Sequence, residues 1–184
     1  MKKPLLFAQD LVRDAVKAGE IVVDATCGNG HDTVFLAQCV GAEGHVYAFD
    51  IQEEAIESTK KRIKSAGVQE RVTLNHANHA NREAWPQTQL AAVMFNLGYL
   101  PGGNHAIITR AETTVSALQI AVNSLKKNGI ITLVVYTGHP GGADEYHAVR
   151  NFCAALSQQN FAVLEYQFIN QLNQPPLLLA VKRL

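Results

Sequence analysis

Two short apolar runs in this sequence each end in an aspartate. The first run ends in Asp24 and continues into the turn Gly28-Asn29-Gly30, and the second ends in Asp50, twenty residues after Gly30. This order brings backbone N–H groups and two carboxylates to the carboxyl ends of neighbouring strands, where α/β proteins bind nucleosides. A glycine-rich turn alone is weak evidence, because an ordinary strand, turn and helix with an acidic rim would look the same. The second acidic strand end favours the nucleoside site.

The residues after the turn indicate which nucleoside fits. A dinucleotide site needs a third glycine and a helix N-terminus that is free to hold pyrophosphate. Thr33 stands at the position of the third glycine, and the carboxylate of Asp32 would repel a pyrophosphate. S-adenosylmethionine carries no phosphate, and it has a cationic sulfonium, an ammonium and two ribose hydroxyls. We therefore expect this cofactor, with Asp24 toward its methionine end and Asp50 on the ribose.

A tetrapeptide after the fourth apolar run, Asn96-Leu97-Gly98-Tyr99, carries the groups needed to hold an amine. It resembles the Asn-Pro-Pro-Tyr signature of methyltransferases that modify amino nitrogens. In that signature the Asn side chain and a backbone carbonyl accept hydrogen bonds from the amine, and the aromatic ring stacks on the planar part of the substrate. Leu97 and Gly98 replace both prolines here. The alternative is a Gly-Tyr turn whose ring packs on the core.

A second polar loop, residues 136–145, follows the fifth predicted strand and contains Tyr136, His139 and three glycines. An imidazole ordinarily titrates near pH 6.5, so His139 could accept a proton from an ammonium substrate. The alternative is an ordinary surface histidine. A metal site formed by His139, Asp144 and His147 matches no standard ligand spacing, so we expect no metal.

Three polar residues are weaker candidates. Asn78 and His79 follow the third strand, where a fold of this type contacts adenine, so either could lie at the edge of the base. His105 follows a glycine pair and could reach the substrate.

Alternating patterns of apolar residues predict the elements that position these groups. The patterns indicate helices over residues 5–19, 32–40, 53–66, 109–127 (ending at Asn128-Gly129) and 143–158, and strands over residues 20–24, 45–50, 71–75, 90–95, 130–136, 161–169 and 177–182. Five βα units closed by a hairpin predict an α/β, Rossmann-like class I methyltransferase fold. It has a seven-stranded, mostly parallel sheet, an antiparallel C-terminal hairpin and helices on both faces. We expect residues 1–184 to form one domain.

Composition narrows the function classes. The 16 basic and 16 acidic residues cancel, so no overall field draws the chain onto nucleic acid or an anionic membrane. The Lys and Arg residues at 60–64 follow three glutamates at helical spacing, which is typical of a solvated helix face rather than an RNA patch. The three cysteines show no metal or disulfide spacing, and no apolar run is long enough to span a membrane. We expect a cytoplasmic protein.

Three motifs taken in order closely resemble a family of small bacterial class I methyltransferases that were long labelled rRNA methylases. The motifs are residues 24–33, 96–103 and 136–142. The family is linked to modification of the tRNA wobble uridine. The resemblance implies transfer of a methyl group from S-adenosylmethionine to the amine of 5-aminomethyl-2-thiouridine in the anticodon stem-loop of tRNA, giving the 5-methylaminomethyl form. It also implies a homodimer, in which two subunits could assemble a basic groove that neither has alone.

The predicted site contains cofactor-binding, catalytic and substrate-binding residues. Those expected at the cofactor are Asp24, Cys27, Gly28, Asn29, Gly30, Asp32, Thr33, Asp50, Ile51, Gln52, Asn78, His79, Asn96, Leu97 and Gly98. The expected catalytic residues are Asn96, Tyr99 and His139, and the expected substrate contacts are Tyr99, Pro101, Gly102, Tyr136 and His139.

Two alternatives to a tRNA amine methyltransferase stay open. One is an N-methyltransferase that acts on rRNA, a protein or a small molecule, and the neutral charge favours the protein or the small molecule. The other is a non-catalytic module that binds S-adenosylmethionine, against which Asn96 and Tyr99 argue, because a binding module needs no groups that aim an amine.

Overall fold

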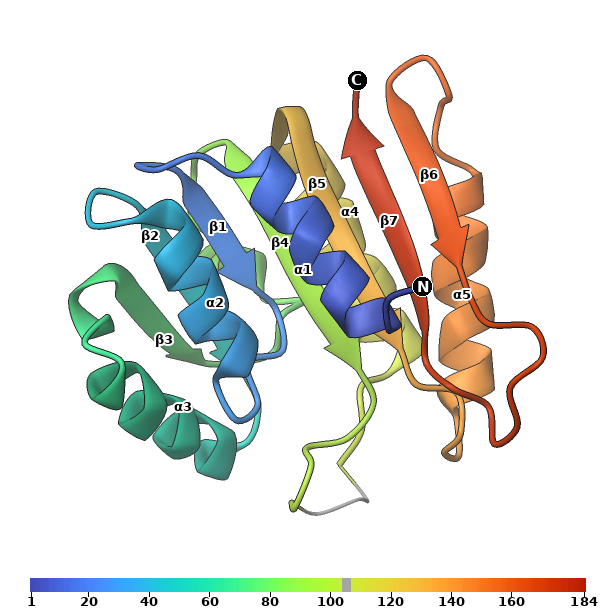
Figure 1. Cartoon of the computed structure of the whole chain (residues 1–184), viewed down its shortest axis with the longest axis horizontal. Helices are drawn as coiled ribbons and strands as arrows, with labels where there is room; N and C mark the ends of the chain where they lie inside the picture. Colours follow the sequence, from blue (N-terminus) through green and yellow to red (C-terminus); the bar gives the residue numbers. More distant parts are fainter. Residues whose placement is uncertain (104–106) are drawn as a thin grey trace.

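The computed structural model describes residues 1–103 and 107–184, in which α-helices and strands alternate except between the third and fourth strands and at a final pair of strands (Figure 1). The strands are β1 (Ile21–Asp24), β2 (His45–Asp50), β3 (Val72–His76), β4 (Leu90–Leu97), β5 (Leu125–Val135), β6 (Phe161–Tyr166) and β7 (Leu177–Arg183). The helices are α1 (Pro4–Ala15), α2 (His31–Val40), α3 (Glu53–Ser65), α4 (Ala111–Ser124) and α5 (Gly142–Ala154), with short 3-10 turns η1 (Gln69–Arg71) and η2 (Arg82–Ala84).

The seven strands form one sheet in the order β3-β2-β1-β4-β5-β7-β6. Strands β3, β2, β1, β4 and β5 pair in parallel, and β7 pairs antiparallel with both β5 and β6. The predicted fold class is therefore confirmed. The chain leaves β1 toward β2 and β3 on one side and returns to β4 and β5 on the other. The boundary between β1 and β4 is thus the switch point at which such sheets bind ligands.

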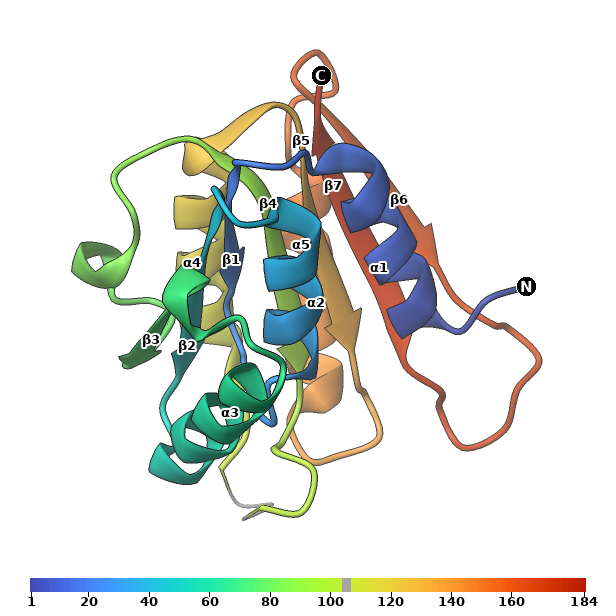
Figure 2. The same ribbon diagram turned by 60° about the vertical axis from the view of Figure 1, so that its left-hand side comes forward.

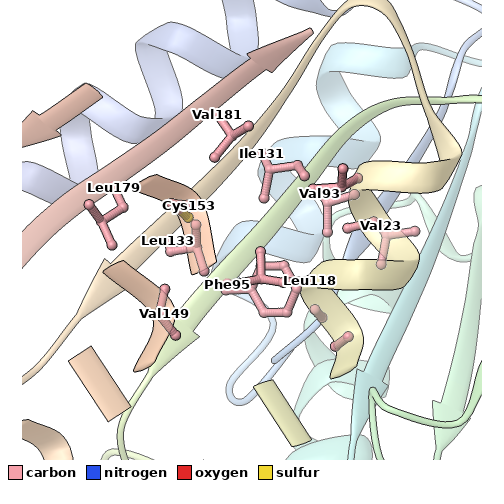
Figure 3. Packing of buried hydrophobic residues seen from close by; sticks show 14 of the residues in the cluster. Val23, Val93, Phe95, Leu118, Ile131, Leu133, Val149, Cys153, Leu179 and Val181 are labelled. Carbon is pink, nitrogen blue, oxygen red and sulfur yellow. The ribbon is translucent and has the colours of Figure 1, made fainter. Parts of the chain in front are cut away.

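Helices cover both faces of the sheet: α1, α2 and α3 lie on one face, and α4 and α5 lie on the other (Figures 1 and 2). Each face has its own apolar core. Leu36 of α2 and Val12 of α1 pack in the first core. In the second, Leu118 of α4 and Val149 of α5 meet side chains of the central strands, as Figure 3 shows. Because β4 is covered on both faces, its residues from Leu90 to Phe95 are all buried.

The boundary between α4 and β5 differs from the prediction. The helix was expected to continue to residue 127 and to end at Asn128-Gly129, but α4 ends at Ser124 and β5 begins at Leu125. Leu125 pairs with Leu90 and is fully buried, whereas the next pair in register joins Ala92 to Ile130. Asn128, with φ of +63°, therefore lies in an irregularity of the strand rather than at a helix end.

Three further elements are shorter than expected. Helix α1 ends at Ala15 rather than near residue 19. Helix α5 ends at Ala154 rather than at residue 158, and β6 ends at Tyr166 rather than at residue 169. In β6 the paired residues run from Phe161 to Tyr166, so the ladder to β7 stops there. No helix in the described part of the chain is long and apolar enough to cross a membrane.

Candidate functional site

The glycine-rich turn between β1 and α2 is held tightly against α3. Gly28 and Gly30 have φ values of +49° and +78°, a conformation that favours glycine. A Cβ atom on Gly30 would lie 2.9 Å from the Cα atom of Thr59 in α3, which is closer than a side chain allows. The Thr59 hydroxyl donates a hydrogen bond to the Gly28 carbonyl oxygen at 2.9 Å. The backbone of the turn therefore has one fixed shape beside the end of β2.

Asp50, the last residue of β2, accepts hydrogen bonds from this turn. Its Oδ2 atom accepts from the Gly28 N–H at 3.0 Å, and its Oδ1 atom accepts from the Gln52 N–H at 3.0 Å. Burial raises the pKa of Asp50, and these backbone N–H groups oppose the rise. Asp50 and Gln52 are half-buried, and Ile51 between them is exposed. A carboxylate oxygen accepts more than one hydrogen bond, so Asp50 can hold the turn and still accept from ligand hydroxyls.

Asp24, the last residue of β1, lies beneath the turn rather than at its surface. Its side chain is fully buried, its Oδ2 atom accepts a hydrogen bond from the Thr33 hydroxyl at 2.6 Å, and its Oδ1 atom accepts from the Thr26 N–H. Burial raises the pKa of Asp24 to about 7, and the nearby charge of Asp32 adds to the rise. The structure thus places both Asp24 and Thr33 behind the residues that line the surface.

Asp32 lies in the first turn of α2 and joins three elements. The Asn96 amide donates a hydrogen bond to its Oδ2 atom at 2.6 Å, and the amide of Gln9 in α1 donates to its Oδ1 atom at 2.8 Å. The Asn96 backbone N–H donates to the Thr26 hydroxyl at 2.7 Å. Asn96, near the end of β4, is therefore fixed through both its backbone and its side chain at the switch point.

The loops that follow β4 and β5 meet beside Asn96. The Tyr136 N–H donates to the carbonyl oxygen of buried Leu97 at 3.1 Å, and the rings of Tyr99 and His139 meet edge to face with their centroids 5.9 Å apart. A Cβ atom on Gly98 would lie 3.5 Å from the Tyr136 Cβ atom and 3.6 Å from His139 Nε2. Tyr99 and Tyr136 are 41% and 40% exposed, so two aromatic rings are open to a ligand at this edge.

The contacts of His139 define its neutral form. Its Nδ1 atom lies 3.0 Å from the Pro140 carbonyl oxygen. A carbonyl only accepts hydrogen bonds, so Nδ1 carries the proton in the neutral ring and Nε2 carries the lone pair. Nε2 is buried and has no partner within residues 1–103 and 107–184. The imidazole therefore presents an unused acceptor close to Gly98.

His79 follows the same pattern on the other side of β1. Its Nδ1 atom lies 3.1 Å from the Ala25 carbonyl oxygen, and its buried Nε2 atom has no partner in the described part of the chain. Burial lowers the pKa of His79, which favours the neutral ring. Asn78 accepts a hydrogen bond from the Ala80 N–H, and burial raises the pKa of Cys27 in the turn. Cys27 is therefore a buried thiol of low reactivity.

The loop after β4 reaches back over the glycine-rich turn. The Asn29 amide donates to the Pro101 carbonyl oxygen at 3.1 Å, and a Cβ atom on Gly28 would lie 3.3 Å from a methyl group of Leu100. Pro101 and Gly102 themselves are exposed. His105, which could reach a substrate, lies outside the described residues.

Three contributors to this site carry no local sequence signal. Gln9, which lies outside the three motifs, holds Asp32, and Thr26, which lies within residues 24–33 but has no role predicted from sequence, holds the Asn96 backbone. Glu145 is buried and accepts hydrogen bonds from the Thr109 and Thr114 hydroxyls, each at 2.6 Å. It thereby ties the end of the loop after β4 to α4 and α5. Among the described residues, no group of three or more His, Cys, Asp or Glu side chains is arranged to hold a metal ion.

Comparison with known proteins shows which family this chain is similar to. A family model described as "Putative rRNA methylase" matches residues 46–182. A relative from Arabidopsis thaliana, named tRNA (mnm5s2U34)-methyltransferase, chloroplastic, is 41% identical over 192 residues, covering 99% of this chain and 70% of the relative.

Two crystal structures are similar over the whole chain. A "putative rRNA-methylase" from Clostridium thermocellum has a TM-score of 0.97 and 44% identity, covering 100% of this chain and 99% of that one. A "putative methyltransferase" from Streptococcus mutans, in complex with SAH, has a TM-score of 0.91 and 35% identity, again covering 100% and 99% of the two chains.

The raised pKa of buried Asp24 predicts how stability changes with pH. The native pKa is about 7 and the ordinary value is 3.8, so the native state binds more protons between these values and the free energy of unfolding falls as pH rises through them. Asp24→Asn removes this titration. From pH 5 to pH 7.5 we expect the free energy of unfolding, measured with urea, to fall by about 3 kcal/mol more in the wild type than in the variant. Parallel pH profiles would contradict the assignment, and Asp14→Asn, an exposed change in α1, is the control.

Proposed function

This chain belongs to the family described as "Putative rRNA methylase", and on that premise we propose that it methylates the aminomethyl nitrogen of 5-aminomethyl-2-thiouridine at the wobble position of tRNA. The chain is an S-adenosylmethionine-dependent methyltransferase. The relative that is 41% identical over nearly the whole chain carries a tRNA wobble-uridine methyltransferase name, which supports the tRNA substrate.

One structural observation carries the choice of an amine. Asn96, Tyr99 and His139 meet at the ends of β4 and β5, beside the glycine-rich turn. An amide oxygen and an imidazole lone pair accept hydrogen bonds from an amine, and an exposed tyrosine ring stacks on a planar base. A hydroxyl has only one hydrogen to donate and could bond to one of these two acceptors at a time, whereas a neutral primary amine has two.

The residues around the turn fit the cofactor. Asp50 offers a half-buried carboxylate to ribose hydroxyls, and the buried, unpartnered Nε2 atom of His79 offers an acceptor where an adenine amino group could lie. In the described residues, no Lys or Arg forms an ion pair with Asp24, Asp32 or Asp50. Asp32 and Asp50, two carboxyl groups with no cationic partner among these residues, suit a ligand that carries an ammonium and a sulfonium. We also propose that the cofactor contacts Cys27, Asn29, Gly30 and Asn78, as the sequence predicts.

S-adenosylmethionine, when bound, supplies an electrophilic methyl group and leaves as S-adenosylhomocysteine. The chain must present the amine in its neutral form, because an ammonium has no lone pair. The Asn96 oxygen accepts one N–H of the amine and fixes the direction of the nitrogen lone pair. The His139 Nε2 atom takes the proton that the nitrogen loses, and Tyr99 and Tyr136 hold the base.

The RNA partner must be recognised locally, because the chain has no net charge. We propose that the anticodon stem-loop docks over the exposed loops that follow β4 and β5. In the expected homodimer, two subunits could assemble a basic groove that neither has alone, which is how a neutral chain could hold an RNA.

Nucleoside mass spectrometry tests the substrate directly. The protein is incubated with S-adenosylmethionine and tRNA that carries 5-aminomethyl-2-thiouridine, and the digested tRNA is analysed. We expect the 5-methylaminomethyl nucleoside at the wobble position. Parallel reactions contain rRNA or a free amine in place of the tRNA. If one of these is methylated and the tRNA is unchanged, the result favours another kind of N-methyltransferase. If the cofactor binds but no product forms in any reaction, the result favours a non-catalytic binding module.

The position of Asp50 predicts a loss of cofactor affinity in Asp50→Ala. The change removes charge-assisted hydrogen bonds to the ribose and the acceptor for the Gly28 N–H. We expect about ten- to a hundredfold weaker binding in calorimetry, which corresponds to about 1.5 to 3 kcal/mol. Asp50→Asn keeps one acceptor oxygen, so its affinity for the cofactor should lie between those of the wild type and Asp50→Ala. Equal affinity of Asp50→Ala and the wild type would remove Asp50 from the site.

The position of Asn96 predicts a loss of turnover with cofactor affinity retained. In Asn96→Ala the amine loses the acceptor that aims its lone pair, and this bond matters most in the transition state. We expect kcat to fall roughly 100-fold, while the Kd of S-adenosylhomocysteine stays nearly unchanged. A proportional loss of cofactor binding would mean that Asn96 has only a structural role.

The unpartnered Nε2 atom of His139 predicts a pH effect on the chemical step. If this atom accepts the proton, the single-turnover rate of the wild type should rise with pH and then level off. In His139→Ala this limb should disappear, and the remaining rate should rise toward the ordinary pKa of an aliphatic amine, about 10. A variant that keeps both the limb and the rate would make solvent the proton acceptor.

A further inference from the structure

The Asp32 carboxylate lies between two side-chain amides from distant parts of the chain. Asn96 donates to Oδ2 at 2.6 Å and Gln9 donates to Oδ1 at 2.8 Å. Asp32 is only 6% exposed. Both oxygens of the carboxylate are thus engaged at the switch point of the sheet, immediately below the place where the amine is proposed to bind.

The chemistry of a carboxylate decides how the Asn96 amide must be turned. An ionised carboxylate only accepts hydrogen bonds, so the amide has to present its NH2 group to Asp32. The Asn96 Oδ1 atom, at the other end of the planar amide group, then points away from Asp32. Within the described residues the Asn96 side chain has no other hydrogen-bond partner, so Asp32 alone fixes which end of the amide faces outward. A flipped amide would present hydrogen-bond donors to the N–H groups of an amine.

A structural role alone does not account for Asp32. An acidic residue in the first turn of a helix complements the helix dipole, but an exposed carboxylate would achieve this. Asp32 is instead buried close to Asp24, whose pKa it helps to raise. Keeping two like charges together costs folding free energy, and such pairs are found where function requires them.

We propose that Asp32 is a positioning residue for methyl transfer: it holds the Asn96 amide with its oxygen toward the acceptor amine, and Gln9 of α1 holds Asp32 in turn. This inference rests on the proposed amine acceptor. It assigns Asp32 to the orientation of Asn96 rather than to direct contact with the cofactor, and it links the first helix of the chain to the reacting group.

The variant Asp32→Asn tests this role with almost no change in shape. The new amide cannot accept from both neighbours, and its own NH2 group can donate to Asn96 Oδ1, which turns the Asn96 amide the wrong way. We expect kcat to fall about 10- to 100-fold, with the KM for tRNA and the Kd of S-adenosylhomocysteine within about threefold of the wild type. Gln9→Met should reduce kcat in the same direction by a smaller factor. Asp14→Asn, an exposed change in α1, should leave kcat unchanged.

A double-mutant cycle separates orientation of Asn96 from an independent contribution. If Asp32 acts through Asn96, adding Asp32→Asn to Asn96→Ala should lower kcat by no more than about twofold further. If instead the loss of kcat in the double variant is the product of the losses in the two single variants, the proposal is overturned. A Kd of S-adenosylhomocysteine that weakens in step with kcat would also overturn it, and would make Asp32 a cofactor contact.

An NMR measurement is independent of the substrate. The side-chain NH2 resonances of Asn96, identified by their loss in Asn96→Ala, should lie downfield in the wild type because of the charge-assisted bond, and should move upfield in Asp32→Asn. Unmoved resonances overturn the proposal even if kcat falls. If the wild type forms no methylated wobble nucleoside while these resonances do move, the amine substrate fails and the hold of Asp32 on Asn96 stands.

Discussion

The register between β1 and β4 is the constraint on which the site depends. Val22 pairs with Ala92 and Asp24 with Met94. The same offset brings Thr26 opposite Asn96, where the Asn96 N–H bonds to the Thr26 hydroxyl. A slip by one residue would turn Asn96 to the opposite face of the sheet and away from Asp32. The buried apolar side chains of β4 prevent such a slip, because it would exchange the two cores that the strand faces.

Electrostatics at this edge are balanced by neutral donors rather than by cations. Asp24, Asp32 and Asp50 accept hydrogen bonds from hydroxyl, amide and backbone N–H groups, with no ion pair to any of them in the described residues. Hydrogen bonds reduce the cost of burying these groups but leave their negative potential in place. The acidic edge of the free protein therefore favours a positively charged ligand at the switch point, in agreement with the cofactor position proposed above.

Local sequence predicted the elements and their order, because each strand end and glycine turn is encoded by neighbouring residues. The β1 and β2 ends, the turn at Gly28 and the antiparallel final strands lie as expected. The predicted end of α4 was wrong. Leu125 pairs with Leu90 in the sheet instead of continuing the helix. This contact between distant residues outweighs the local helix-ending signal of Asn128-Gly129. Gln9 was missed for a similar reason: it meets Asp32 only after α1 packs on the sheet.

The two halves of the site are held by different means. On the cofactor side, Asp50 and the glycine-rich turn belong to strand ends, and backbone hydrogen bonds fix them. On the acceptor side, Tyr99 and His139 lie on loops, and buried Glu145 anchors one of those loops through Thr109. The loop after β4 also contacts the turn, because Asn29 donates a hydrogen bond to the Pro101 carbonyl oxygen. Asn96 is held by the strand but faces the loops, so its position affects both halves of the site.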